Sequence, residues 1–359
     1  MRKKCIFFPK RRFFIEKTFC KNGKICYNEI MKQTKKNKKQ NQPQSKQGAF
    51  KALLDKPTRE NSSGFAFSFA AVFIFALSLI VSLILAWTGF NPNTDSTKDW
   101  YLYVSFSLAP AALLLAGLWY FYRTKKSVLQ TLKKQVCHWK YYLIAIVLQI
   151  GLFSVSYLNT LFAEFLGWLG FASPPPSIPS LDGFGFVGVI LVVALLPAIF
   201  EEILFRGIVL DGAYAYGTAG AVLLCGGLFA LYHQNPLQTV YPFVCGAAFA
   251  LLAIRSRSVF PTMLAHFLNN LLIIILEKAK VTDIPNFVFI PVIILSGLCL
   301  LGTLGYLIFA DKNRLPDEEG DTLAQQKTKR GVYILAAAIG ILICFVGWTN
   351  ALYTGFVGS

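Results

Sequence analysis

Long stretches without a single charged residue are the feature that most constrains this chain of 359 residues. Eight stretches contain no Asp, Glu, Lys or Arg, and they cover residues 61–94, 100–122, 141–163, 183–200, 212–254, 258–276, 284–310 and 331–359. A helix needs about 20 mostly apolar residues to cross the hydrocarbon core of a membrane. Most of the stretches can supply one such helix, and 212–254 is long enough for two, joined by a turn at Gln234-Asn235-Pro236.

The apolar stretches predict an all-α polytopic membrane protein with about nine transmembrane helices. We expect these helices near residues 64–88, 101–122, 141–163, 184–206, 216–233, 237–254, 258–277, 287–310 and 331–351. Only 15% of the residues are charged, whereas soluble domains usually have about 25%. The composition therefore excludes a soluble globular enzyme.

The positive charge of the chain is concentrated at its N-terminus. Residues 1–60 hold 18 of the 35 Lys and Arg residues but only four of the 18 acids, so most of the net charge of +17 lies there. This tail is polar and rich in Gln and Lys, which predicts disorder. A basic segment before a first membrane helix is expected to contact anionic lipid head groups. We therefore expect a lipid partner and no nucleic-acid partner.

Charges in the loops predict the orientation in the membrane. Basic residues that are expected on the same side as the tail include Arg123, Lys125, Lys126, Arg255, Arg257, Lys312 and Arg330. The loop between the third and fourth helices has no basic residue. The positive-inside rule then predicts a multi-pass protein of the cell membrane with a cytoplasmic N-terminus.

Ionisable and amide side chains gather on three of the apolar helices. The fourth helix carries Glu201, Glu202 and Arg206, the fifth carries Phe229 and His233, and the seventh carries His266, Asn269 and Asn270. Ionisable residues inside a membrane are costly and by default indicate a functional site. Glu202 and Arg206 are four residues apart, a spacing that predicts an ion pair on one helix face. Glu201 is turned by about 100° from Glu202 and is free to point elsewhere.

The remaining spacings add further functional groups to this set. His266 and Asn270 are also four residues apart and are expected to project together, while Phe229 lies one turn before His233 and its ring could line a cavity. Two imidazoles, a carboxylate and a carboxamide from three helices are sufficient for hydrolysis without a metal, or for holding one. Zinc is thus possible but not required, and no cofactor is expected.

The pattern EExxxR, FxxxH and HxxxN, in that order on successive apolar helices, resembles the CPBP family. This family comprises the CAAX-protease and bacteriocin-processing (Abi-type) membrane proteins. They are glutamic endopeptidases that were once thought to be metalloproteases. The resemblance covers about residues 183–275. It implies a catalytic core on helices four to seven, at residues 183–277. Together with the charge distribution and the apolar stretches, this predicts a basic tail at 1–60, N-terminal helices at 61–182 and C-terminal helices at 278–359.

The resemblance also implies roles for individual residues. Glu201 and His233 would activate a water molecule for attack on a peptide carbonyl, and His266 and Asn270 would stabilise the oxyanion. Glu202, Arg206 and Phe229 would be supporting residues. The implied activity is the hydrolysis of a peptide bond in a membrane-associated protein or peptide.

Two other function classes remain open at this point. One is a non-catalytic membrane scaffold or bacteriocin self-immunity protein of the same fold, and the other is a proton-coupled transporter. One feature of the predicted helices also fits catalysis poorly: Glu201 lies near the cytoplasmic end of its helix, whereas His233 lies about 25 Å from that side at 1.5 Å per residue. Helix tilt, a broken helix or shifted boundaries must bring the two side chains together.

Overall fold

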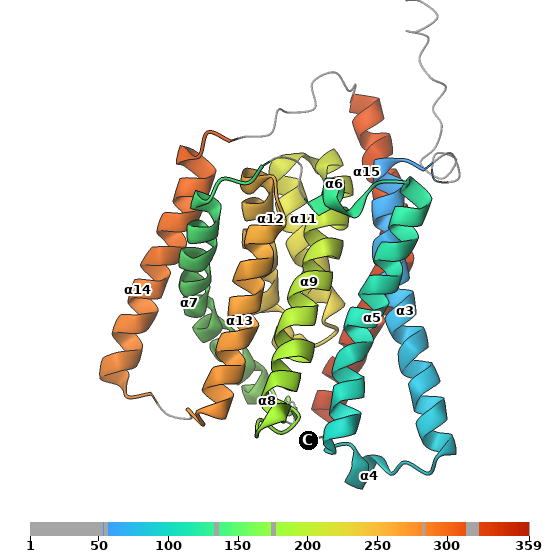
Figure 1. The fold of residues 1–359 in the computed structure, drawn as a ribbon, viewed down its shortest axis with the longest axis vertical. Helices are drawn as coiled ribbons and strands as arrows, with labels where there is room; N and C mark the ends of the chain where they lie inside the picture. Colours follow the sequence, from blue (N-terminus) through green and yellow to red (C-terminus); the bar gives the residue numbers. More distant parts are fainter. Residues whose placement is uncertain are drawn as a thin grey trace, which may run out of the picture. The chain divides into compact units, whose positions relative to one another are not determined.

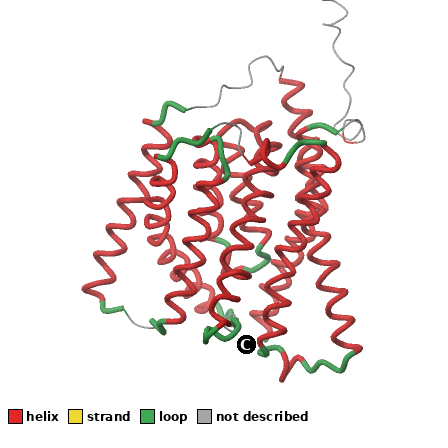
Figure 2. Tube along the Cα trace, viewed as in Figure 1, coloured by secondary structure: helices red, strands yellow, loops and turns green. Residues whose placement is uncertain are grey.

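Helices joined by loops make up the part of the chain that the structure describes (Figure 2). The computed structural model describes Leu53 and residues 57–132, 136–173, 177–281, 284–313 and 323–358, all within one compact unit, Gly48–Ser359. No β-strand element occurs in these ranges, so the predicted all-α fold class is confirmed. The basic tail and its predicted lipid contacts fall outside the described residues, apart from Leu53 and residues 57–60.

Eight helical segments in these ranges are long and apolar enough to cross a membrane (Figure 1). They are Arg59–Trp87 (α3), Asp99–Thr124 (α5), Lys140–Trp168 (α7), Phe184–Tyr232 (α8 to α11), Pro236–Ser256 (η4 and α12), Phe260–Lys278 (α13), Asn286–Ala310 (α14 and η5) and Leu323–Val357 (α15). The short helices α4 (Pro92–Asp95) and α6 (Val128–Leu132) lie in the connections. The chain is therefore a multi-pass membrane protein, and its fourth segment contains two of the nine expected helices.

The fourth segment doubles back on itself. Its elements are α8 (Phe184–Val189), the π-helix η1 (Ile190–Leu195), α9 (Leu196–Glu202), the π-helix η2 (Ile203–Val209), α10 (Leu210–Ala213), the 3₁₀ turn η3 (Tyr214–Tyr216) and α11 (Gly217–Tyr232). Gly217 has a φ of +76°, which residues with a side chain rarely adopt. The Cys225 thiol donates to the Phe205 carbonyl at 3.4 Å, although a straight helix would separate the two residues by about 30 Å. Helix α11 therefore packs antiparallel to η2.

This turn reduces the difference in depth between Glu201 and His233 to about 6 Å. The helix that carries Glu201 continues to Ala213, seven residues beyond its expected end near residue 206. Glu201 then lies about 18 Å before Ala213, and His233 follows α11 about 24 Å after the turn at Gly217. The boundary of the fourth helix was predicted too short, because the π-helix η2 accommodates Arg206 and Gly207 within a continuing helix.

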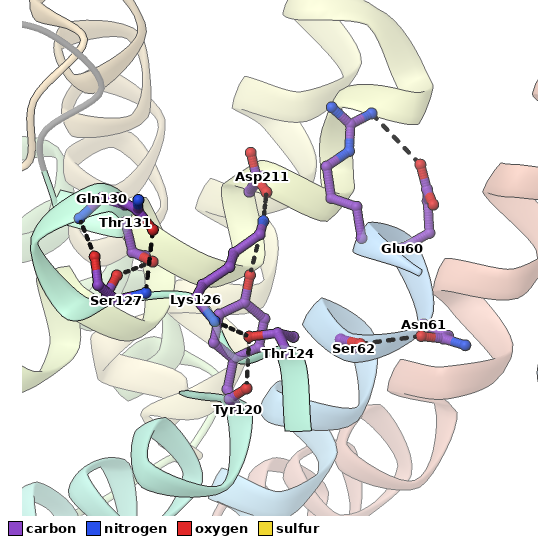
Figure 3. A network of polar contacts seen from close by, with 11 residues as sticks. Glu60, Asn61, Ser62, Tyr120, Thr124, Lys126, Ser127, Gln130, Thr131 and Asp211 are labelled. Carbon is purple, nitrogen blue, oxygen red and sulfur yellow. Dashed lines mark hydrogen bonds and ion pairs between the residues drawn. The ribbon is translucent and has the colours of Figure 1, made fainter. Parts of the chain in front are cut away.

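Hydrogen bonds between loops define two ends of the unit. At one end, called the basic end, the Lys126 amine lies 3.2 Å from the Asp211 carboxylate and 3.3 Å from the Tyr120 hydroxyl (Figure 3). Burial lowers the pKa of the Lys126 amine, but the neighbouring Asp211 and Tyr120 outweigh it and raise that pKa above its usual value. Further contacts gather Arg255 and Arg330 at the same end as the start of α15 and the end of α10.

At the opposite end of the unit, the loop before α8 contacts both α5 and α13. The Ser180 amide donates to Asp99 at 2.8 Å, and the Lys278 amine donates to the Leu181 carbonyl at 2.6 Å. Exposed tryptophans flank both ends, with Trp139 near the basic end and Trp87 and Trp168 at the other. Tryptophan is enriched at the two membrane–water interfaces, so this distribution agrees with a bundle that crosses a bilayer.

Small residues allow the helices to approach closely. Between α3 and α15, a Cβ on Gly64 would lie 2.5 Å from the Tyr333 carbonyl oxygen, and Ser68 donates to the Ala336 carbonyl at 2.7 Å. Between α11 and α12, a Cβ on Gly246 would lie 2.8 Å from the Cα of Gly226. Membrane helices associate through such close packing, because lipid provides little hydrophobic force between them.

Candidate active site

The predicted ion pair between Glu202 and Arg206 is present and fully buried. Arg206 Nη1 donates to Glu202 Oε1 at 2.7 Å, and both side chains have no exposed surface. Arg206 Nη2 donates to the Gly246 carbonyl on α12 at 3.3 Å. The guanidinium carbon also lies 4.4 Å from the centre of the Phe229 ring, in a cation–π contact. Arg206 therefore connects η2 to both α11 and α12.

His266 on α13 lies between the two carboxylates of α9. Its Nδ1 is 2.8 Å from Glu202 Oε1, and its Nε2 is 3.9 Å from Glu201 Oε2. A carboxylate can only accept a hydrogen bond, so Nδ1 carries a proton and donates it to Glu202. The adjacent acids thus contact the two nitrogens of one imidazole, a contact that their sequence positions alone did not indicate.

Glu201 has a carboxylate oxygen without a partner. Its side chain is 13% exposed, and Oε2 is buried with no hydrogen-bond partner among the described residues. The Tyr232 hydroxyl, Glu202 Oε2 and Arg206 Nε are likewise buried and unpartnered in this region. A buried polar atom without a partner costs about 1–3 kcal/mol, so several of them near one point indicate a place where a ligand or reactant supplies the missing bonds.

His233 packs against the ring of Phe229, which also contacts His266. The His233 ring centre is 4.9 Å from that of Phe229, and the His266 ring centre is 6.0 Å from it. His233 Nδ1 is 2.8 Å from the Phe229 carbonyl oxygen, which can only accept. The proton is therefore on Nδ1, and Nε2 has a free lone pair when the ring is neutral. Phe229 thus contacts both imidazoles as well as Arg206.

Asn270 faces the same helical segment as His266, as their spacing predicts. Its Nδ2 donates to the carbonyl of Val193 in η1 at 3.0 Å. The neighbouring Asn269 points elsewhere: its Oδ1 accepts from Gln149 on α7 at 2.8 Å and from the Tyr241 hydroxyl on α12. Gln149 and Tyr241 were not identified from the sequence, although a glutamine in the middle of the apolar stretch 141–163 is a signal that could have found the first.

The structure brings the predicted site residues together to different degrees. Contacts join Glu201, Glu202, Arg206 and His266 directly, and Phe229 links His233 to them. Asn270 lies one helical turn after His266 on α13, and it also donates to the Val193 carbonyl in η1. Within the described ranges, no group of three or more His, Cys, Asp or Glu side chains has an arrangement that could hold a metal ion.

Comparison with known protein families gives one finding. Residues 183–272 match the family described as type II CAAX prenyl endopeptidase Rce1-like. This segment is similar to the Rce1-like family. The match covers about a quarter of the chain, and it contains all seven predicted site residues. In the same comparisons, no curated protein and no solved structure matches the chain.

The Rce1-like segment confirms the resemblance to the CAAX-protease and bacteriocin-processing family. It extends from α8 to α13, so the matched residues form one contiguous part of the bundle. The protein therefore has a membrane-embedded fold of the CAAX-protease type. The Rce1-like segment is surrounded by the helices α3, α5, α7, α14 and α15, which lie outside the match.

Proposed function

We propose that the protein is a membrane-embedded endopeptidase that hydrolyses a peptide bond of a membrane-associated protein or peptide. The observation that carries this proposal is the buried, unpartnered Oε2 of Glu201, which lies 3.9 Å from Nε2 of His266 inside the Rce1-like segment. A free carboxylate oxygen in an apolar environment is a suitable general base for a water molecule. The alternative, a non-catalytic scaffold or self-immunity protein, does not require a buried carboxylate oxygen without a hydrogen bond.

In the proposed reaction, Glu201 and His233 activate the water. Glu201 accepts a proton while the water oxygen forms a bond to the carbonyl carbon, and the lone pair on Nε2 of His233 orients the same water. The Phe229 carbonyl supports this role, since it holds the proton of His233 on the other nitrogen. When the C–N bond breaks, the proton passes from Glu201 to the leaving amine. The products are a carboxylic acid and an amine, which exchange a proton to give a carboxylate and an ammonium group.

His266 and Asn270 stabilise the negative charge on the tetrahedral intermediate. For His266 this role requires protons on both ring nitrogens, with Nδ1–H donated to Glu202 and Nε2–H donated to the oxyanion. Two carboxylates, a guanidinium and an imidazolium then form a buried cluster without net charge, which lowers the cost of burying each charge. Each oxyanion donor in such a site contributes about 3–4 kcal/mol to catalysis.

We further propose that the basic end of the unit faces the cytoplasm of a cell membrane. Basic residues at this end outnumber the acids, which agrees with the positive-inside rule and with a cytoplasmic N-terminus. The substrate would be held at the bilayer by its own lipid or apolar anchor. Anionic lipids are the proposed partners of the basic N-terminal tail.

Purified protein in proteoliposomes provides the test. The probes are a fluorogenic farnesylated peptide that ends in a CAAX tetrapeptide and the same peptide without the farnesyl group. We expect the wild type to cleave a probe, and Glu201→Gln and His266→Ala to lower kcat by about 10²-fold or more. Glu164→Gln, which changes an exposed glutamate on α7, is the matched control and should keep the wild-type rate.

Three results would count against the proposal. Equal rates for the wild type and Glu201→Gln would refute the role of this carboxylate. Loss of cleavage with a chelator would show that a metal takes part. Cleavage of neither probe would favour the non-catalytic scaffold over the endopeptidase.

A further inference from the structure

A chain of side-chain hydrogen bonds crosses the bundle beside the candidate site. Gln149 Nε2 on α7 donates to Asn269 Oδ1 at 2.8 Å, and the Tyr241 hydroxyl on α12 donates to the same oxygen. Asn269 Nδ2 donates to Asn270 Oδ1 at 3.0 Å, and Asn270 Nδ2 donates to the Val193 carbonyl at 3.0 Å. We call Gln149, Tyr241 and Asn269 the polar relay.

The relay leaves only one orientation for the Asn270 carboxamide. The Val193 carbonyl can only accept, so the amino group of Asn270 must face η1. A flipped Asn270 would place its oxygen against that carbonyl oxygen and its amino group against the amino group of Asn269. Both ends of the carboxamide therefore oppose the flip. With one N–H bonded to Val193, the second N–H of Asn270 is left for another acceptor.

The hydrogen bond from Asn270 to the Val193 carbonyl is related to a proline in the sequence. In an α-helix, the Val193 carbonyl would accept from the backbone N–H of residue 197, but residue 197 is proline and has no N–H. Val193 lies in the π-helix η1, directly before α9 with its two glutamates. Neighbouring helices often supply the donor for a carbonyl that a proline leaves free in a membrane helix. Asn270 donates to the Val193 carbonyl, which ties α13 to the helix just before Glu201 and Glu202.

Burying the polar side chain of Gln149 costs folding free energy, and its packing alone does not explain why a polar residue is there. Gln149 is 6% exposed in an apolar helix, and its Oε1 is buried without a partner in the described structure. A leucine at this position would fill a similar volume and leave no unpartnered oxygen. The polar contact that this glutamine makes is through its donor, the Nε2–H that reaches Asn269.

We propose that Gln149, Tyr241 and Asn269 are positioning residues, which hold Asn270 so that its second N–H points at the developing oxyanion. This inference rests on the proposed function, because the relay acts only through Asn270. It predicts that weakening the relay changes the rate of the chemical step and leaves substrate binding unchanged, since the relay lies one residue beyond the group that would touch the substrate.

The experiment is a double-mutant cycle with the farnesylated CAAX probe in proteoliposomes. We expect Asn270→Ala to lower kcat by about 10²- to 10³-fold and Gln149→Leu to lower it by roughly 10- to 100-fold, with KM near the wild-type value. The double variant Gln149→Leu/Asn270→Ala should be no slower than Asn270→Ala alone, because the relay acts through the same group. Ser154→Ala is the control, since Ser154 on α7 bonds only to a carbonyl of its own helix.

Tyr241→Phe serves as a second, milder variant that removes a single hydroxyl, and it decides the question if Gln149→Leu does not fold. Wild-type kcat in the relay variants, combined with a slow Asn270→Ala, would overturn the relay and leave the proposed function intact. Losses that multiply in the double variant would also overturn it, because Gln149 would then act independently of Asn270. A fully active Glu201→Gln, or no cleavage by the wild type, would overturn the proposed function and the relay with it.

Discussion

Replacement of Arg206 by methionine tests whether the buried ion pair supports the site. In the wild type, the guanidinium donates to Glu202 and to the Gly246 carbonyl and lies over the Phe229 ring. Methionine has a similar length but no charge and no donor. Arg206→Met therefore leaves Glu202 buried with His266 as its single hydrogen-bonded charged neighbour.

The burial of the pair sets the expected magnitude. Both side chains have no exposed surface, and removing one partner of a buried pair costs about 3–5 kcal/mol. The double variant Arg206→Met/Glu202→Gln removes both charges and should recover roughly 1–3 kcal/mol of this loss. The remaining cost reflects the lost bond to Gly246 and the lost cation–π contact, each about 1 kcal/mol.

Unfolding in mixed micelles with increasing SDS, followed by circular dichroism, measures these free energies. Arg330→Met is the matched control, because Arg330 lies at the basic end and donates to the Ala215 carbonyl at 2.8 Å. With its cation–π contact to Tyr216, this change should cost about 1–2 kcal/mol. A loss below 1 kcal/mol for Arg206→Met would falsify the view that the pair is a buried support, as would a double variant whose loss equals the sum of the two single losses.

Two further predictions concern packing and the basic end. Gly226→Ala should destabilise the protein by about 1–3 kcal/mol, because its new Cβ would lie 2.8 Å from the Phe243 carbonyl oxygen, whereas Gly227→Ala meets no atom within 4 Å and should cost nothing. Equal losses in the two variants, measured by the same SDS titration, would contradict this packing argument. Lys126→Met should cost less than about 1 kcal/mol and less still in 1 M salt, because Lys126 is partly exposed and its attraction to Asp211 is screened. A loss of several kcal/mol that does not depend on salt would show that the pair is effectively buried.

The sequence predicted the class of fold, and it supplied the set of candidate site residues, because both depend on local patterns. The length of the apolar stretches requires membrane helices, whatever their partners are. The spacing of Glu202 and Arg206 places them on one helix face, and the ion pair follows from that spacing alone. Ionisable side chains are rare in apolar helices, so Glu201, His233 and His266 could be identified as candidate site residues from the sequence alone.

The tertiary structure decided how these residues meet. The sequence contains no signal for the extension of the fourth helix to Ala213, because a π-helix differs from an α-helix by one hydrogen-bond register and has no marked composition. Contacts between helices also placed His266 between Glu201 and Glu202, and joined Asn269 to Gln149 across 120 residues of chain. Periodicity along one helix defines its faces but not the neighbour that each face meets. The sequence by itself therefore determined which groups are available for chemistry, and only the packing of the helices decided which of them contact one another.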